Sequence, residues 1–138
     1  MNTPMFDHEK LRAYQEALRF VAWAEPIIEK FPSRLAARDQ LDRASTSVVL
    51  NIAEGNGKRS HPDRCRFLDI ARGSALECAA CLDVLVGKRK LAASEILEGK
   101  AILVAAVSLI SGLVAYFEGK VGEDQEPYGS MLVENEND

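Results

Sequence analysis

A cluster of basic residues after a glycine-rich turn is the part of this sequence best suited to chemistry. The turn is Gly55-Asn56-Gly57, and the cations of the cluster are Lys58, Arg59, His61, Arg64 and Arg66. Residues 58–72 have a net charge of +3 with His neutral, at the start of an expected helix, where cations oppose the helix dipole. A bound anion would offset this repulsion, and free N–H groups beside Arg and Lys side chains suit phosphate. We therefore predict a candidate contact with RNA or DNA; the alternative is a solvated loop.

Two pairs of polar residues form a second candidate site. Asn51 and Glu54 lie three residues apart on one expected helix, and Ser74 and Glu77 lie three apart on the next. Residues at this spacing share a helix face, so the two pairs can meet between the helices. Two interpretations stay open, a hydrogen-bonded network that sets helix register and a functional polar pocket. Small neighbouring residues predict that the two helices approach closely: Ala44, Ser45, Ser47, Ala53, Gly73 and Ala75.

Patterns for metal binding are weak in this chain. Cys78 and Cys81 have Cys-x-x-Cys spacing, but they lie within an expected helix and no second pair completes four ligands. Neither His8 nor His61 follows a Glu by three residues, as the di-iron site of a helical bundle requires. We therefore expect no metal and no cofactor. With only two His and no set of nucleophile, base and orienting group, we also expect that the protein is not an enzyme.

Hydrophobic periodicity predicts four helices and no strands to position these residues. The expected helices span about residues 8–30, 34–55, 61–90 and 94–119. Ser60 is the expected N-cap of the third helix, and Gly55-Asn56-Gly57 is expected to stop the second because these residues tolerate positive φ. With short connections, this order predicts an all-α, antiparallel up-down-up-down four-helix bundle.

The first and last helices have more apolar surface than one small bundle needs. The first has two apolar stripes roughly 140° apart: Leu11, Leu18, Val21 and Ile28 form one, and Phe20, Trp23 and Ile27 form the other. On the last, residues 101–117 include no charged residue. A membrane span is the rival explanation, but this stretch is short for one, so we expect no membrane partner. We predict a homo-oligomer with these interface residues: Phe20, Trp23, Ile27, Leu109, Leu113 and Phe117.

Length and charge predict one domain with an acidic end. The chain has 138 residues, 47% of them hydrophobic, and a net charge of -4, which argues against a dedicated, strongly basic nucleic-acid binder. Residues 119–138 hold -5 of this charge and the remainder is +1. We expect an N-terminal arm (1–7), a bundle (8–118) and an acidic, disordered tail (119–138). Three cysteines and no apolar signal segment predict a cytoplasmic protein with reduced thiols.

Two short motifs resemble a known family. They are Asn51-Ile52-Ala53-Glu54-Gly55 and, further along, Ala71-Arg72-Gly73-Ser74-Ala75-Leu76-Glu77, preceded by a Leu11 to Phe31 stretch that ends in Phe-Pro. The pattern resembles the 23S ribosomal RNA intervening-sequence proteins over about residues 8–118. This resemblance implies a bacterial, cytosolic four-helix bundle, a ring-like homopentamer in some members, with no established activity. A distant relative, the accessory protein of diversity-generating retroelements, is a basic pentamer that works with a reverse transcriptase and nucleic acid; the near-neutral body of this chain departs from it.

The sequence therefore predicts a non-enzymatic, self-assembling bundle that contacts RNA or DNA through its basic cluster. The first alternative is a scaffold oligomer that binds a protein and no nucleic acid. A second is an enzyme with Glu54 or Glu77 as its base, which would need that carboxylate in a cleft that solvent reaches.

Overall fold

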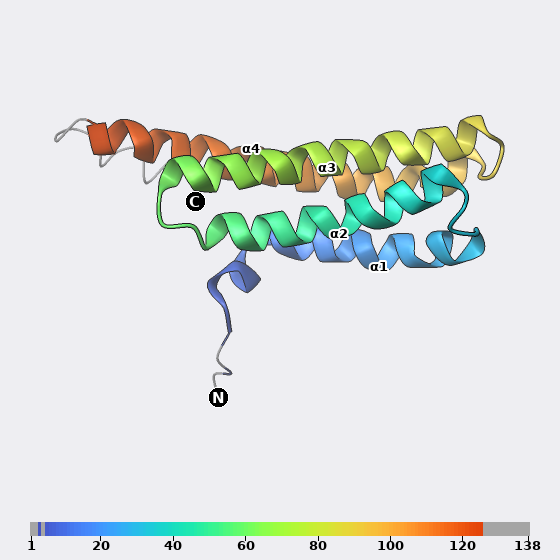
Figure 1. The fold of residues 1–138 in the computed structure, drawn as a ribbon, viewed down its shortest axis with the longest axis horizontal. Helices are drawn as coiled ribbons and strands as arrows, with labels where there is room; N and C mark the ends of the chain where they lie inside the picture. Colours follow the sequence, from blue (N-terminus) through green and yellow to red (C-terminus); the bar gives the residue numbers. More distant parts are fainter. Residues whose placement is uncertain (1–2, 4, 126–138) are drawn as a thin grey trace.

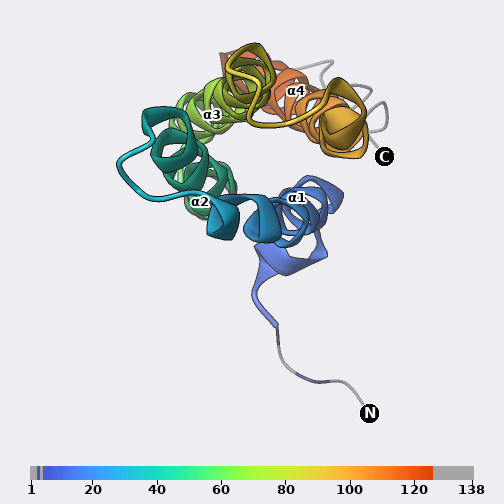
Figure 2. The ribbon, with the colours of Figure 1, turned by 90° about the vertical axis from the view of Figure 1, so that its right-hand side faces the viewer.

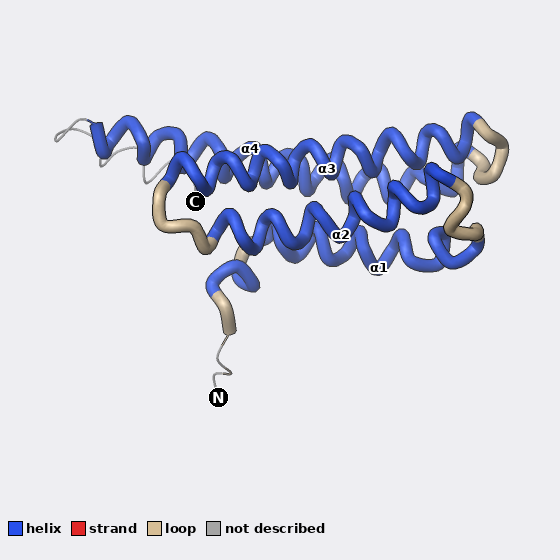
Figure 3. Tube along the Cα trace, viewed as in Figure 1, coloured by secondary structure: helices blue, strands red, loops and turns tan. Residues whose placement is uncertain are grey.

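Four long helices make up almost all of the structure. The computed structural model describes residue 3 and residues 5–125, which form helices and connecting turns with no strand (Figures 1 and 3). Two short 3-10 helices precede α1 and α4. The elements are η1 (Asp7–Lys10), α1 (Arg12–Lys30), α2 (Ala36–Asn56), α3 (His61–Gly87), η2 (Ala93–Ile96) and α4 (Leu97–Gln125). The prediction of an all-α chain with four helices is confirmed.

The helices lie in two layers, with α1 beside α2 and α3 beside α4. Successive helices are joined at alternate ends (Figure 1), and the end-on view shows α1 on the same side of the bundle as α4 and α2 on the same side as α3 (Figure 2). The contact between α2 and α3 is the most extensive, and α1 contacts both α2 and α4. The last helix continues to Gln125, beyond the end at Gly119 that the sequence predicted. Residues 126–138 of the predicted acidic tail lie outside the described residues.

The core face of α1 differs from the prediction. Phe20 and Ile27, expected at a subunit interface, are 2% and 9% exposed inside the chain, and Leu18 is 44% exposed instead. The reason is a run of small residues that the prediction did not use. Ala13, Ala17 and Ala24 alternate with the two larger side chains at spacings of four and three, and all five are buried. This regular seam, typical of packed helices, turns the Phe20 stripe inward.

Three further residues expected at the interface also face inward or sideways. Phe117 is 6% exposed, so its assignment to a subunit interface is wrong. Leu109 and Leu113 are half-buried and face the groove between α4 and α1. The large exposed side chains of α4, Leu97 and Val104, lie on another side of the helix.

Two glycines allow helices to approach closely. A Cβ on Gly55 would lie 3.0 Å from the Cβ of Phe67 and 3.3 Å from the carbonyl oxygen of Arg64, so α3 is close to α2 at this point. A Cβ on Gly99 would overlap the ring of Trp23, which is therefore half-buried against α4 rather than free for a neighbour. Gly57 caps α2 at a φ of -88°, so the positive φ expected there is not found.

We expect Gly99→Ala to lower the free energy of unfolding by about 1 to 3 kcal/mol, because the added methyl group displaces the Trp23 ring in a packed interior. Gly73→Ala is the matched control. Nothing lies within 4 Å of a Cβ on Gly73, so better helix propensity raises stability there by up to about 1 kcal/mol. Urea unfolding followed by circular dichroism measures both; a stabilised Gly99→Ala protein would contradict the contact.

Candidate nucleic-acid interface

The basic cluster lies at the turn between α2 and α3. The Oγ of Ser60 accepts a hydrogen bond of 3.2 Å from the backbone N–H of Asp63, which confirms Ser60 as the N-cap. The backbone N–H of Lys58 donates to the Gly55 carbonyl oxygen at 3.2 Å, so the turn stays close to the end of α2. This short, capped turn places the cations around the first two turns of α3.

Two phenylalanine rings hold most of these cations in place. The Nζ of Lys58 lies 4.5 Å from the centre of the Phe67 ring, and the guanidinium carbon of Arg66 lies 5.0 Å from the same ring. Such cation–π contacts are each worth about 0.5 to 1 kcal/mol at an exposed site. The prediction did not include Phe67, because nothing in the spacing of the sequence shows that the turn folds Lys58 back over α3.

Phe117 of α4 holds the other two residues. The ring of His61 stacks on it at 5.5 Å with an angle of 16° between the planes, and the guanidinium of Arg64 lies 4.9 Å from its centre. Arg64 also donates from Nε to the carbonyl oxygen of Lys58 at 2.7 Å. The Nδ1 of His61 is buried with no hydrogen-bond partner among the described residues. Arg64 and His61 therefore fix the turn to α4 and are poor candidates for direct contact with a ligand.

Three cations remain accessible to an anion. Arg59 is exposed and makes no hydrogen bond or ion pair within the described part of the chain. Arg66 has a side chain that is 63% exposed, and its ion pair with Asp63, at 3.2 Å, is open to solvent and weak. Lys58 is half-buried, with its ammonium group beside the Phe67 ring. The candidate interface is therefore reduced to Lys58, Arg59 and Arg66. Arg72 is not included, because its Nε donates a hydrogen bond to the Ser111 Oγ on α4 at 3.0 Å.

The polar network between α2 and α3 is smaller than predicted. The hydroxyl groups of Ser47 and Ser74 are 2.9 Å apart and join the two helices, and Asn51 donates from Nδ2 to the Oγ of Ser47 at 3.0 Å. Glu54 and Glu77 are exposed and make no hydrogen bond in the described structure, so their placement in a hydrogen-bonded network is wrong. Glu77 does line a small polar cleft with Ser47 and Ser74. The two pairs meet only in part, because Ser47, one turn before Asn51, is the residue of α2 that contacts Ser74 directly.

The buried cysteines are unsuited to metal or redox chemistry. Cys78 and Cys81 are both free and buried in α3. Burial raises the pKa of the Cys78 thiol to about 12, with a smaller contribution from Cys81, so it stays protonated at neutral pH. Among residues 3 and 5–120, no three His, Cys, Asp or Glu side chains gather as metal ligands do.

Comparison with known proteins places the chain in a family. The family model of the 23S rRNA-intervening sequence proteins matches residues 9–112, which is most of the chain. The chain belongs to this family. A crystal structure with a similar fold is that of a protein of unknown function from the S23 ribosomal protein family of Bacteroides thetaiotaomicron. It is 20% identical with a TM-score of 0.67, and the match covers 74% of this chain and 97% of that chain. No curated protein matches.

In this chain, the two sequence motifs determine how helices pack. Gly55 of the first motif admits Phe67, and Asn51 of the first is linked through Ser47 to Ser74 of the second. The motifs therefore fix how α2 and α3 pack. That packing in turn sets the position of Phe67 and of the cations on its ring.

We expect Asn51→Ala to lower the free energy of unfolding by about 1 kcal/mol, because Ser47 loses a part-buried hydrogen-bond partner. Glu54→Ala, one turn along the same helix, is the control and should change stability by less than about 0.5 kcal/mol, since its side chain is exposed. Chemical unfolding measures both. Equal effects at the two positions would show that the network does not stabilise the fold.

Proposed function

We propose that the protein is a non-enzymatic, up-down-up-down four-helix bundle that assembles with copies of itself into a ring and contacts RNA or DNA through its basic cluster. The observation that supports assembly most strongly is the exposed, uncharged face of α4. We further propose a cytoplasmic location, in keeping with three free thiols, two of them buried.

The exposed face of α4 has the form of a helix-packing seam. Its side chains recur at spacings of four and three, as in coiled coils, and Leu97 and Val104 are 65% and 70% exposed. Beside it, α3 and α4 border an apolar groove of about 490 Å³ lined by Leu76, Val104 and Val107. Contiguous apolar surface of this kind marks an interaction site. We call this surface the α4 face: Leu97, Ala101, Val104, Ser108 and, two turns on, Ala115 of α4, with Leu76 of α3 at its edge.

A membrane is the competing partner for this face. Among the described residues, Ala93–Lys120 is long and apolar enough to span one, and only 28% of its most apolar stretch is buried. Two polar interactions flank the α4 face, however. Lys100 pairs with Asp83, and Arg72 bonds to Ser111. Lipid would remove water from these charges at a high cost, whereas the rim of a protein interface is polar and wet.

A ring follows if the α4 face meets a different surface of the next copy. Such a contact repeats around an axis until it closes, whereas a face that meets itself stops at two copies. The α3–α4 layer and the α1–α2 layer form opposite sides of the bundle (Figure 2), so two different surfaces are available. Five copies is the number that the family resemblance implies.

We expect Val104→Asp to abolish assembly, because a charge would be buried in each interface. Val104 is 70% exposed in the chain, so the substitution leaves the bundle folded. Met5→Asp is the control: Met5 is 53% exposed ahead of η1, outside both helix layers, and its variant should assemble normally. Native mass spectrometry counts the copies. A monomeric wild-type protein that sediments with phospholipid vesicles would favour the membrane instead.

Nucleic-acid binding rests on Lys58, Arg59 and Arg66, three accessible cations at one end of the bundle. A ring would repeat this modest charge in every copy and form a basic rim. Each phosphate contact releases counterions, so affinity would fall steeply with salt. Glu77 lines a small polar cleft of about 220 Å³ with Ser47 and Ser74, and no His or Cys is among the described residues that line it.

The doubly substituted Lys58→Ala/Arg59→Ala protein should bind a pool of short RNA and DNA at least tenfold more weakly than the wild type, and equally so for all sequences. Lys88→Ala/Lys90→Ala removes the same charge at the opposite end of α3 and serves as the control, with affinity close to wild type. Fluorescence anisotropy at two salt concentrations measures both. A protein scaffold would be favoured if the wild type does not bind nucleic acid, or if binding changes neither with salt nor with the Lys58→Ala/Arg59→Ala substitution.

A further inference from the structure

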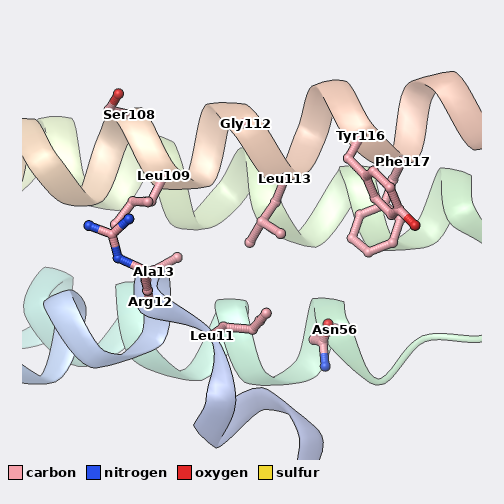
Figure 4. Close-up of a pocket in the computed structure, with 10 residues that line it drawn as sticks. All are labelled: Leu11, Arg12, Ala13, Asn56, Ser108, Leu109, Gly112, Leu113, Tyr116 and Phe117. Carbon is pink, nitrogen blue, oxygen red and sulfur yellow. The ribbon is translucent and has the colours of Figure 1, made fainter. Parts of the chain in front are cut away.

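The described side chains do not fill a groove between α1 and α4. Its volume is about 540 Å³, within the range of small-molecule sites. Figure 4 shows Leu109 and Leu113 pointing from α4 toward the start of α1, with Leu11 below them and Phe117 at one end. The middle of the groove is therefore apolar, and Asn56 of α2 lies at its Phe117 end.

One end of the groove carries a cation with no partner. The Arg12 side chain extends from the first turn of α1 toward α4, beside Leu109 (Figure 4). It makes no hydrogen bond or ion pair within the described residues of the chain. A planar guanidinium binds a carboxylate through two parallel hydrogen bonds, so this end of the groove suits a single negative charge.

A glycine keeps the middle of the groove open. Gly112 lines the groove from within α4, and no atom lies within 4 Å of the position of its Cβ. A glycine inside a helix costs about 0.5 to 1 kcal/mol relative to alanine. At Gly55 and Gly99 this cost is offset because a neighbouring helix or ring packs against the glycine. No neighbouring residue of the described chain packs against Gly112 in this way. Its missing side chain leaves room for an occupant.

We propose that the groove binds a carboxylate with a linear apolar chain, the carboxylate on Arg12 and the chain along Leu109 and Leu113 toward Phe117. The α4 residues that line it run from Ser108 to Phe117, about 14 Å of helix, a length that decanoate matches. A nucleotide is a poorer match, because its phosphates carry more charge than one guanidinium balances. The proposal depends neither on self-assembly nor on nucleic-acid binding.

Isothermal titration of the full-length protein with decanoate, below its micelle concentration, tests the site. We expect saturable binding with one decanoate per chain and none with acetate, which lacks the apolar chain. Gly112→Leu should weaken binding at least tenfold, because the new side chain fills the groove. Gly73→Leu, at another open glycine within a helix, is the matched control and should bind as the wild type does.

The head group is tested separately from the groove. Arg12→Gln should weaken decanoate at least tenfold and leave the weaker binding of decanol unchanged, because only the carboxylate contacts the guanidinium. Circular dichroism and native mass spectrometry confirm that each variant keeps its fold and assembly. Absence of decanoate binding to the wild type, wild-type affinity in Gly112→Leu, or equal loss of decanoate and decanol in Arg12→Gln would each overturn the proposal.

Discussion

The close approach of α2 and α3 is the constraint on which the rest of the structure depends. It is possible because Gly55 leaves room for Phe67. About two turns earlier on α2, the Ser47–Ser74 hydrogen bond fixes the register of the two helices. With α2 and α3 set, the turn between them has one short path, and its cations settle on the two rings available, Phe67 and Phe117. A change at the seam would therefore move the basic cluster without touching any of its residues.

The elements could be predicted from the sequence because each has a local signal. Apolar periodicity gives the four helices, and Ser60 at the head of a charged first turn marks the start of α3. The face that each helix turns inward was harder to predict. On α1 the deciding residues are Ala13, Ala17 and Ala24. Alanine occurs both in cores and on surfaces, so its position in the sequence does not indicate which face is buried. Two large apolar stripes then compete, and only the packing of α4 against α1 decides between them.

The candidate sites show the same limit in another form. The cations of the turn could be predicted as a cluster from the sequence. The fold brings Phe67 and Phe117 to this cluster, and contacts with these two rings decide which cations are structural and which are accessible. Glu54 and Glu77 share the motifs of Asn51 and Ser74 yet are exposed. Residues three apart share a helix face only approximately, whereas a hydrogen bond requires close alignment of its two groups. The groove beside Arg12 has no sequence signal at all, because it is formed by residues from opposite ends of the chain.

The contact between Trp23 and Gly99 gives the protein a built-in optical probe. Trp23 is the single tryptophan of the chain, and its ring lies on the backbone of α4 at the seam with α1. Its emission therefore reports on one seam only, the one that also borders the open groove. Separation of α1 from α4 would expose the indole to water and shift its emission to longer wavelength while α2 and α3 stay paired. Tryptophan fluorescence and total helix content can thus follow two different events in the same molecule, without an attached dye.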